Sequence, residues 1–159
     1  MKISLSRYFA AILGLALLAG FAVATQSQGT PVASADGFGR TEVTFTKYVT
    51  TFPNMAGVVG GDIGNGAFVG EVLNAEPFAD GKIVKLTADY HLNGSVHQST
   101  ARVTVWQFDN QFAVISGAVT SGWRQGALVY GTYKVLSTCP VNPAGPCFQG
   151  TLYFVGGTP

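Results

Sequence analysis

The chain has 159 residues, of which 47% are hydrophobic and only 11% are charged, and its formal net charge at pH 7 is +1. This length suits one domain. So few charges exclude a disordered acidic or basic tail protein. The near-neutral balance also argues against binding through phosphate neutralisation, so no nucleic acid is expected as a partner.

The first predicted element is an export signal. Lys2 and Arg7 precede an almost uninterrupted apolar run over residues 8–21, and Ala22-Val23-Ala24 fits the small-x-small pattern of a cleavage site. We therefore expect residues 1–24 to be a signal peptide. The protein would then be secreted or periplasmic, with no membrane contact after cleavage.

The boundaries of this leader are less sharply defined. A second small-x-small triplet, Ala33-Ser34-Ala35, leaves cleavage open between Ala24 and Ala35, and an uncleaved N-terminal anchor is the alternative reading. We expect residues 25–39 to form a disordered leader and residues 40–159 to form a single domain.

From residue 41 onward the pattern predicts strands. Short runs rich in Val, Thr, Tyr and Phe are separated by Gly, Asn and Asp, and no long window keeps a 3.6-residue apolar period. The runs cover residues 41–50, 55–60, 67–73, 82–92, 96–108, 111–120, 127–136 and 148–155. This series favours an all-β fold, an eight-stranded antiparallel up-and-down β-barrel, because closure leaves no exposed edge strand.

Two turns suggest a register for the central strands. Asn93-Gly94 is typical of a two-residue hairpin turn and would pair Tyr90 with His97. A second turn at Asp109-Asn110 would pair Val105 with Val114.

Alternation then assigns one face of these strands to the barrel interior. The side chains that we expect to line a ligand cavity there, together with one from a later strand, are Leu86, Ala88, Ser99, Ala101, Val103, Val114, Ser116, Ala118 and Tyr133. Many of these are small, and an eight-stranded barrel is just wide enough to hold one small ligand. The alternative is a barrel whose core is filled by bulky residues from the other strands.

Three polar residues are candidates for catalysis. Tyr90 and His97, if paired, would place a phenol and an imidazole near one mouth of an apolar interior, where a histidine can act as a general acid or base. The plainer reading is a rim histidine hydrogen-bonded to Tyr90. Glu71 would join them only if its strand were flipped or bulged, and an outward, solvated Glu71 is the favoured reading.

The outer face of the run 111–120 is expected to carry Ala113, Ile115 and Val119, with Trp106 opposite Ala113. Apolar residues on both faces of a strand indicate that its outside is covered. A homo-oligomer formed through this face would cover it, and so would the N-terminal segment.

The two cysteines, Cys139 and Cys147, flank a segment rich in Pro and Gly. In an oxidising compartment they are expected to form a disulfide. Further soft ligands at short spacing are absent from the sequence, so we expect no metal and no cofactor.

Several architectural motifs resemble the bacterial β-barrels related to allene oxide cyclases and dirigent proteins. They are GGDIGNG at residues 60–66, GEVL at 70–73, VTSGW at 119–123 with Gly126 and Gly131, and CFQGTL at 147–152. The resemblance covers roughly residues 41–156. It implies an eight-stranded antiparallel barrel with a hydrophobic cavity and a cyclisation or coupling activity that holds an apolar substrate in one folded pose.

Three hypotheses follow for function. The first is an exported barrel that binds an apolar small molecule in its interior without catalysis. The second is a cyclase or isomerase acting by confinement, with Tyr90, His97 and Glu71 as candidate polarising groups. The third is a structural barrel with a filled core.

Overall fold

A computed structural model describes residues 39–142 and 145–158 of the chain. In these ranges it is built from β1 (Thr41–Val49), β2 (Asn54–Gly61), β3 (Gly66–Phe78), the 3-10 turn η1 (Ala79–Gly81), β4 (Ile83–Gly94), β5 (Gln98–Phe108), β6 (Phe112–Gly122), β7 (Leu128–Leu136) and β8 (Cys147–Val155). The predicted signal peptide (1–24) and nearly all of the predicted leader lie outside the described residues.

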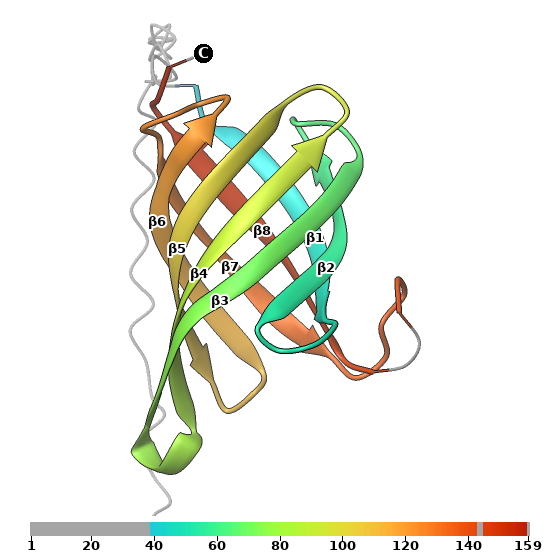
Figure 1. Ribbon diagram of the computed structural model, residues 1–159, viewed down its shortest axis with the longest axis vertical. Helices are drawn as coiled ribbons and strands as arrows, with labels where there is room; N and C mark the ends of the chain where they lie inside the picture. Colours follow the sequence, from blue (N-terminus) through green and yellow to red (C-terminus); the bar gives the residue numbers. More distant parts are fainter. Residues whose placement is uncertain (1–38, 143–144, 159) are drawn as a thin grey trace, which may run out of the picture. The chain divides into compact units, whose positions relative to one another are not determined.

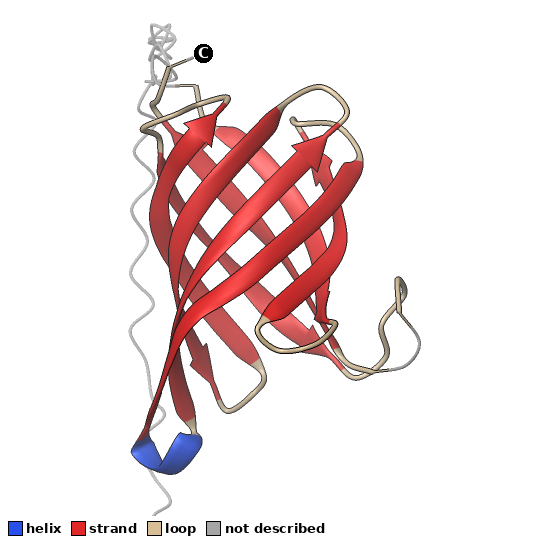
Figure 2. Ribbon diagram, viewed as in Figure 1, coloured by secondary structure: helices blue, strands red, loops and turns tan. Residues whose placement is uncertain are grey.

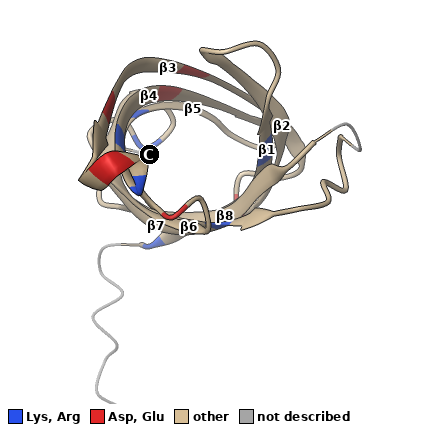
Figure 3. Cartoon of the chain, turned by 90° about the horizontal axis from the view of Figure 1, so that it is seen from below, with Lys and Arg blue, Asp and Glu red and all other residues tan. Residues whose placement is uncertain are grey.

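The strands close into a single barrel in chain order, each antiparallel to its neighbours, and β1 pairs with β8 to complete the ring. Figures 1 and 2 show the strands crossing the barrel wall obliquely, and Figure 3 shows the ring from below. The predicted eight-stranded antiparallel barrel is therefore confirmed. Closure pairs every strand on both sides, so no edge is left exposed.

The two ends of the barrel carry different connections. The lower end, at the bottom of Figure 1, holds the β1–β2 turn, η1, the β5–β6 turn and the β7–β8 connection. The upper end holds the β2–β3, β4–β5 and β6–β7 connections.

The β4–β5 connection differs from the predicted two-residue turn. Asn93 pairs with Gln98, and the loop between the strands hydrogen-bonds to the β2–β3 loop, with the His97 amide donating to the carbonyl of Ile63 at 3.1 Å. Gly94 remains within β4, where that carbonyl of Ile63 would collide with any Cβ. The glycine is required for this close approach and not for a tight turn.

This longer loop shifts the register by an even number of residues, so the faces of the two strands are preserved. Tyr90 pairs with Ala101 and Leu86 pairs with Val105. Because side chains alternate with a period of two, an even shift leaves each residue on its predicted face. The predicted pairing of Tyr90 with His97 is nevertheless wrong.

The β5–β6 connection is one residue longer than predicted, and this reverses the faces of β6. Phe108 pairs with Phe112, with Asp109 and Asn110 at φ angles of 47° and 53°, and Val105 pairs with Ile115. A slip of one residue moves a whole strand to its other face.

The reversal corrects two predictions about β6. The predicted inward residues Val114, Ser116 and Ala118 face outward, and Val114 is 47% exposed. Conversely, the residues expected outside are buried in the barrel interior: Ala113, Ile115 and Val119. These three residues are apolar because they belong to the core, so they do not indicate that the outer face of β6 is covered. A homo-oligomer through this face stays a prediction.

The predicted disulfide is present. Cys139 and Cys147 are bonded, with their Cα atoms 5.1 Å apart, and both are buried. The bond fixes the start of β8 to the connection that follows β7, at the lower end of the barrel.

Candidate functional site

A lysine lies inside the lower half of the barrel. In β1, Val43, Phe45 and Lys47 alternate inward, and Lys47 is only 2% exposed. Its cross-strand neighbours are Phe148 in β8 and Gly57 in β2. A Cβ on Gly57 would collide with the β1 backbone.

The Lys47 amine is surrounded mainly by aromatic rings. Nζ donates a hydrogen bond to the Tyr90 hydroxyl and contacts the Met55 Sδ at 3.5 Å. Its distances to the surrounding ring centroids are 4.2 Å for Tyr90, 5.1 Å for Tyr133, 5.7 Å for Phe68, 5.8 Å for Phe148 and 5.9 Å for Phe45. These residues come from strands on opposite sides of the barrel, so closure of the sheet creates this cluster.

No carboxylate balances this amine. Across residues 39–142 and 145–158, the ion pairs are Lys85 with Glu76 and Arg102 with Asp89, and neither involves Lys47. A charged group that loses its water without gaining a partner is strongly disfavoured. Lys47 therefore differs from the other charged residues of the barrel, and its environment favours the neutral amine.

Burial lowers the pKa of Lys47 from 10.5 to about 7. The faces of the surrounding rings attract an ammonium and oppose this shift, but the loss of hydration is the larger effect. Near neutral pH a large fraction of the Lys47 side chains thus carries a free electron pair on nitrogen. Such a lysine can act as a nucleophile or a base.

The two neighbouring phenols are held in their protonated form. Burial, and then the neighbouring Tyr133, raise the pKa of Tyr90 well above its ordinary value, and burial also raises the pKa of Tyr133. Tyr133 donates a hydrogen bond of 2.6 Å to Oε1 of Gln107. Tyr90 can therefore serve as a proton donor beside the Lys47 amine.

Some inward side chains at the lower end of the barrel are partly exposed. Leu86, Val135 and Phe148 belong to the inward face, because they share cross-strand rows with buried residues, yet each is only partly buried. A hollow of about 410 Å³ lies at this end, between β1 and the β7–β8 connection, and Phe148 forms part of its wall. Phe148 also belongs to the cluster around Lys47, with its ring centroid 5.8 Å from Nζ.

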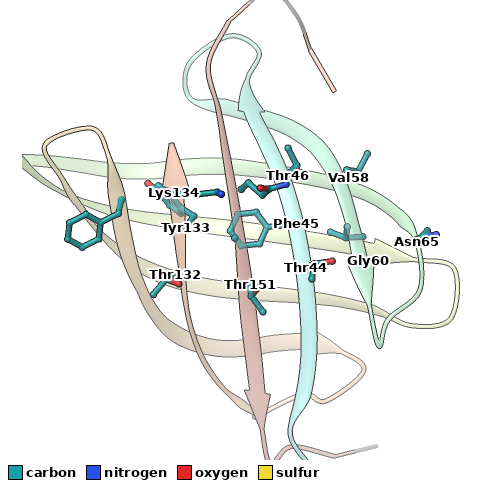
Figure 4. Close-up of a pocket in the computed structure, with 14 residues that line it drawn as sticks. Thr44, Phe45, Thr46, Val58, Gly60, Asn65, Thr132, Tyr133, Lys134 and Thr151 are labelled. Atoms are coloured by element: carbon teal, nitrogen blue, oxygen red, sulfur yellow. The ribbon is translucent and has the colours of Figure 1, made fainter. Parts of the chain in front are cut away.

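A second hollow, of about 800 Å³, lies on the outside of β7, β8, β1 and β2 (Figure 4). Its wall mixes hydroxyls and other polar groups with exposed apolar side chains; the labelled residues with outward side chains include Thr44, Thr46, Val58, Asn65, Thr132, Lys134 and Thr151. Its lining also includes Phe45 and Tyr133, whose rings belong to the Lys47 cluster, but Lys47 itself does not line it.

The predicted catalytic residues are not brought together. Tyr90 is fully buried in the Lys47 cluster, whereas His97 lies in the upper β4–β5 loop with its ring stacked on Trp123 at 3.8 Å and 2°. Glu71 is exposed on the outer face, opposite Asp89. His97 and Glu71 thus lie apart from Tyr90, and a catalytic role for these three residues stays a prediction.

The predicted lining residues divide between the two faces. Ala88, Ser99, Ala101, Val103 and Tyr133 are buried inside the barrel, and Leu86 is partly buried at the lower end. Val114, Ser116 and Ala118 are outside, as described above. Contact of the inward residues with a ligand stays a prediction.

Lys47 was missed by the sequence analysis, although a signal for it exists. The run over residues 41–50 alternates with Val43 and Phe45 on the apolar face, and that alternation also assigns Lys47 to this face. The contact with Tyr90 has no such signal, because it depends on which strands face each other across the closed barrel.

Comparison of the chain with family models, with curated proteins and with solved structures gave no match. The resemblance to allene oxide cyclases and dirigent proteins thus stays a prediction.

In the part of the chain that the structure describes, no group of three His, Cys, Asp or Glu residues is placed to hold a metal ion. The same part contains no helix with the length and apolar character needed to cross a membrane.

Proposed function

We propose that this protein is a β-barrel that binds an apolar small molecule in its interior. The molecule would enter at the lower end and place its one polar group against Lys47 and Tyr90. The observation that carries the proposal is a buried amine without an ionic partner, in a cluster of aromatic rings. Phe148, a member of this cluster, is also part of the wall of the lower hollow. Small-molecule sites typically combine a mostly apolar wall with a few polar groups.

The same amine and phenol support a second candidate, a cyclase or isomerase that confines a reactive apolar substrate. Lys47 would accept a proton and Tyr90 would donate one, in place of His97 and Glu71. An enzyme of this kind must convert its substrate into a product. A conversion that Tyr90→Phe slows and His97→Ala leaves unchanged would support it.

We also propose that the protein acts outside the cytoplasm, as secreted or periplasmic. The disulfide between Cys139 and Cys147 supports this proposal, because such bonds persist mainly in oxidising compartments. Cell fractionation with an antibody against the barrel tests it, and recovery in the cytoplasm alone would contradict it.

Binding can be tested with Nile red, an uncharged apolar dye. We expect saturable fluorescence enhancement at micromolar dye concentration. Leu86→Lys, which adds a charge to the inward face at the lower end, should weaken binding at least about tenfold.

Thr87→Lys is the matched control, because the neighbouring position on β4 has its side chain on the outer face. It should leave the affinity within about twofold. Equal weakening by both variants, or no binding by the unmodified protein, would contradict an interior site, and the latter would favour a purely structural barrel.

A further inference from the structure

We propose that Lys47 forms a reversible imine with an aldehyde or ketone group at the polar end of the bound apolar molecule. This inference rests on the proposed function and specifies its ligand class as apolar carbonyl compounds. Binding would then include a covalent bond to Lys47, which the binding of an apolar molecule alone does not require.

The surroundings of Lys47 match the requirements of an amine nucleophile. The nitrogen must be unprotonated to attack carbon, and a site without carboxylates and with little water favours that state. The charged or titratable side chains with a described contact to Nζ are Tyr90 and Tyr133, both of them neutral phenols. The remaining contacts are Met55, Phe45, Phe68 and Phe148.

Tyr90 supplies the second group that the reaction needs. Its hydroxyl already lies in hydrogen-bond contact with Nζ, and burial keeps its proton on the oxygen. A carbonyl oxygen entering beside the amine would therefore meet a proton donor. Donation to that oxygen makes the carbonyl carbon more electrophilic.

The step balances without an oxidant or a reductant. The electron pair of the Lys47 nitrogen forms a bond to the carbonyl carbon, while the carbonyl oxygen takes a proton and becomes the hydroxyl of a carbinolamine. Tyr90 gives that proton and regains one from the nitrogen. The second nitrogen proton is lost as the carbon–nitrogen double bond forms, and it leaves with the hydroxyl group as water when the carbon–oxygen bond breaks. The products are an imine and one water molecule, and hydrolysis reverses the sequence.

An apolar chain attached to the carbonyl would extend from Lys47 toward the lower end. In that direction the inward side chains Leu86, Val135 and Phe148 are apolar and partly exposed. The hollow that has Phe148 in its wall lies at the same end of the barrel.

The test is reductive trapping with octanal. The purified protein is incubated at neutral pH with octanal and sodium cyanoborohydride, which reduces an imine to a stable secondary amine, and the modified residue is located by mass spectrometry of peptides. We expect an octyl group on Lys47 to form at least about tenfold faster than on the exposed Lys82 or Lys134.

Two variants make the result specific. Lys47→Met should remove the fast adduct while circular dichroism shows a retained barrel, and Tyr90→Phe should slow adduct formation at Lys47 about tenfold or more. Modification of Lys82 and Lys134 at the same rate as Lys47 would overturn the inference.

Competition between octanol and Nile red separates this inference from the proposed function. Octanol has the same chain but no carbonyl group. Displacement of the dye by octanol together with no adduct on Lys47 would overturn the imine and leave the binding function standing. If octanol fails to displace the dye and no adduct forms, both proposals are contradicted.

Discussion

The upper and lower halves of this barrel are built from the same strands but have different interiors. The upper half is filled by aliphatic and aromatic side chains with no exposed surface, among them Val43, Ile63, Leu92, Leu152 and Phe154. The lower half contains Lys47 within an aromatic cluster, and its inward residues at the end are partly exposed. The lower half also contains fully buried apolar residues such as Val105 and Ile115, so the buried amine is what distinguishes it from the upper half.

Lys47 lowers the stability of the lower half. Close-packed apolar side chains contribute most of the stability of a fold, whereas a buried lysine without an ionic partner reduces it. Residues that lower stability and are retained inside a barrel are typical of functional sites. Substitutions in the upper and lower halves, and on the inner and outer faces of the strands, test this difference between the two halves.

The largest expected effect distinguishes the two faces of β6. Ile115→Lys places a charge in the buried core and should reduce the free energy of unfolding by at least about 4 kcal/mol. Val114→Lys, on the exposed face of the adjacent position, should change it by less than about 0.5 kcal/mol. Urea denaturation of both variants measures this, and the opposite order would show that β6 faces the other way.

The next effect is a pH dependence that originates in the lower half. The pKa of Lys47 is about 7 in the folded protein and has its ordinary value of 10.5 in the unfolded chain. Between pH 7 and pH 9 the unfolded chain therefore binds a proton that the folded protein releases, so stability rises with pH. Across these two units the gain is at most about 3 kcal/mol. Well below pH 7, where Lys47 is protonated in both states, this contribution no longer changes.

Lys47→Met should abolish this slope. The variant also leaves the Tyr90 hydroxyl without its partner, which costs about 1–3 kcal/mol at every pH in this window. The difference in unfolding free energy between the two proteins at pH 7 and at pH 9 is therefore the informative quantity. Parallel stability curves would contradict the assignment of a neutral amine.

The smallest effect is expected in the upper half. His97→Ala removes a ring stacked on Trp123 and should lower the free energy of unfolding by about 1 kcal/mol. Because His97 lies at the opposite end from the proposed opening, the affinity for Nile red should stay within about twofold. A loss of dye binding in this variant would show that the dye binds at the upper end.

The limits of prediction from sequence follow from the same geometry. Alternation of apolar and polar residues identified all eight strands, and closure followed because their connections are short. The inward and outward faces of β4 and β5 were predicted correctly although the turn between them was not. The reason is that the loop after Asn93 is longer than predicted by an even number of residues. The two faces of β6 were predicted the wrong way round, because the turn after Phe108 is one residue longer than predicted.

The candidate site was less predictable than the fold. Tyr90 was recognised as an inward phenol, but its partner was sought at His97 on the neighbouring strand. The partner is Lys47 on β1, across the interior. Contacts across a barrel depend on the stagger of all of its strands, and a single misplaced turn is enough to lose them.

The central claim is that the lower half holds a neutral lysine amine where an apolar ligand binds. Its most direct test is a titration of protein labelled with ¹³C at the lysine ε-carbons, followed by NMR with and without octanol. We expect one resonance, absent in Lys47→Met, that titrates with a midpoint of about 7 and shifts on addition of octanol. A Lys47 resonance with a midpoint near 10.5, unmoved by octanol, would contradict it.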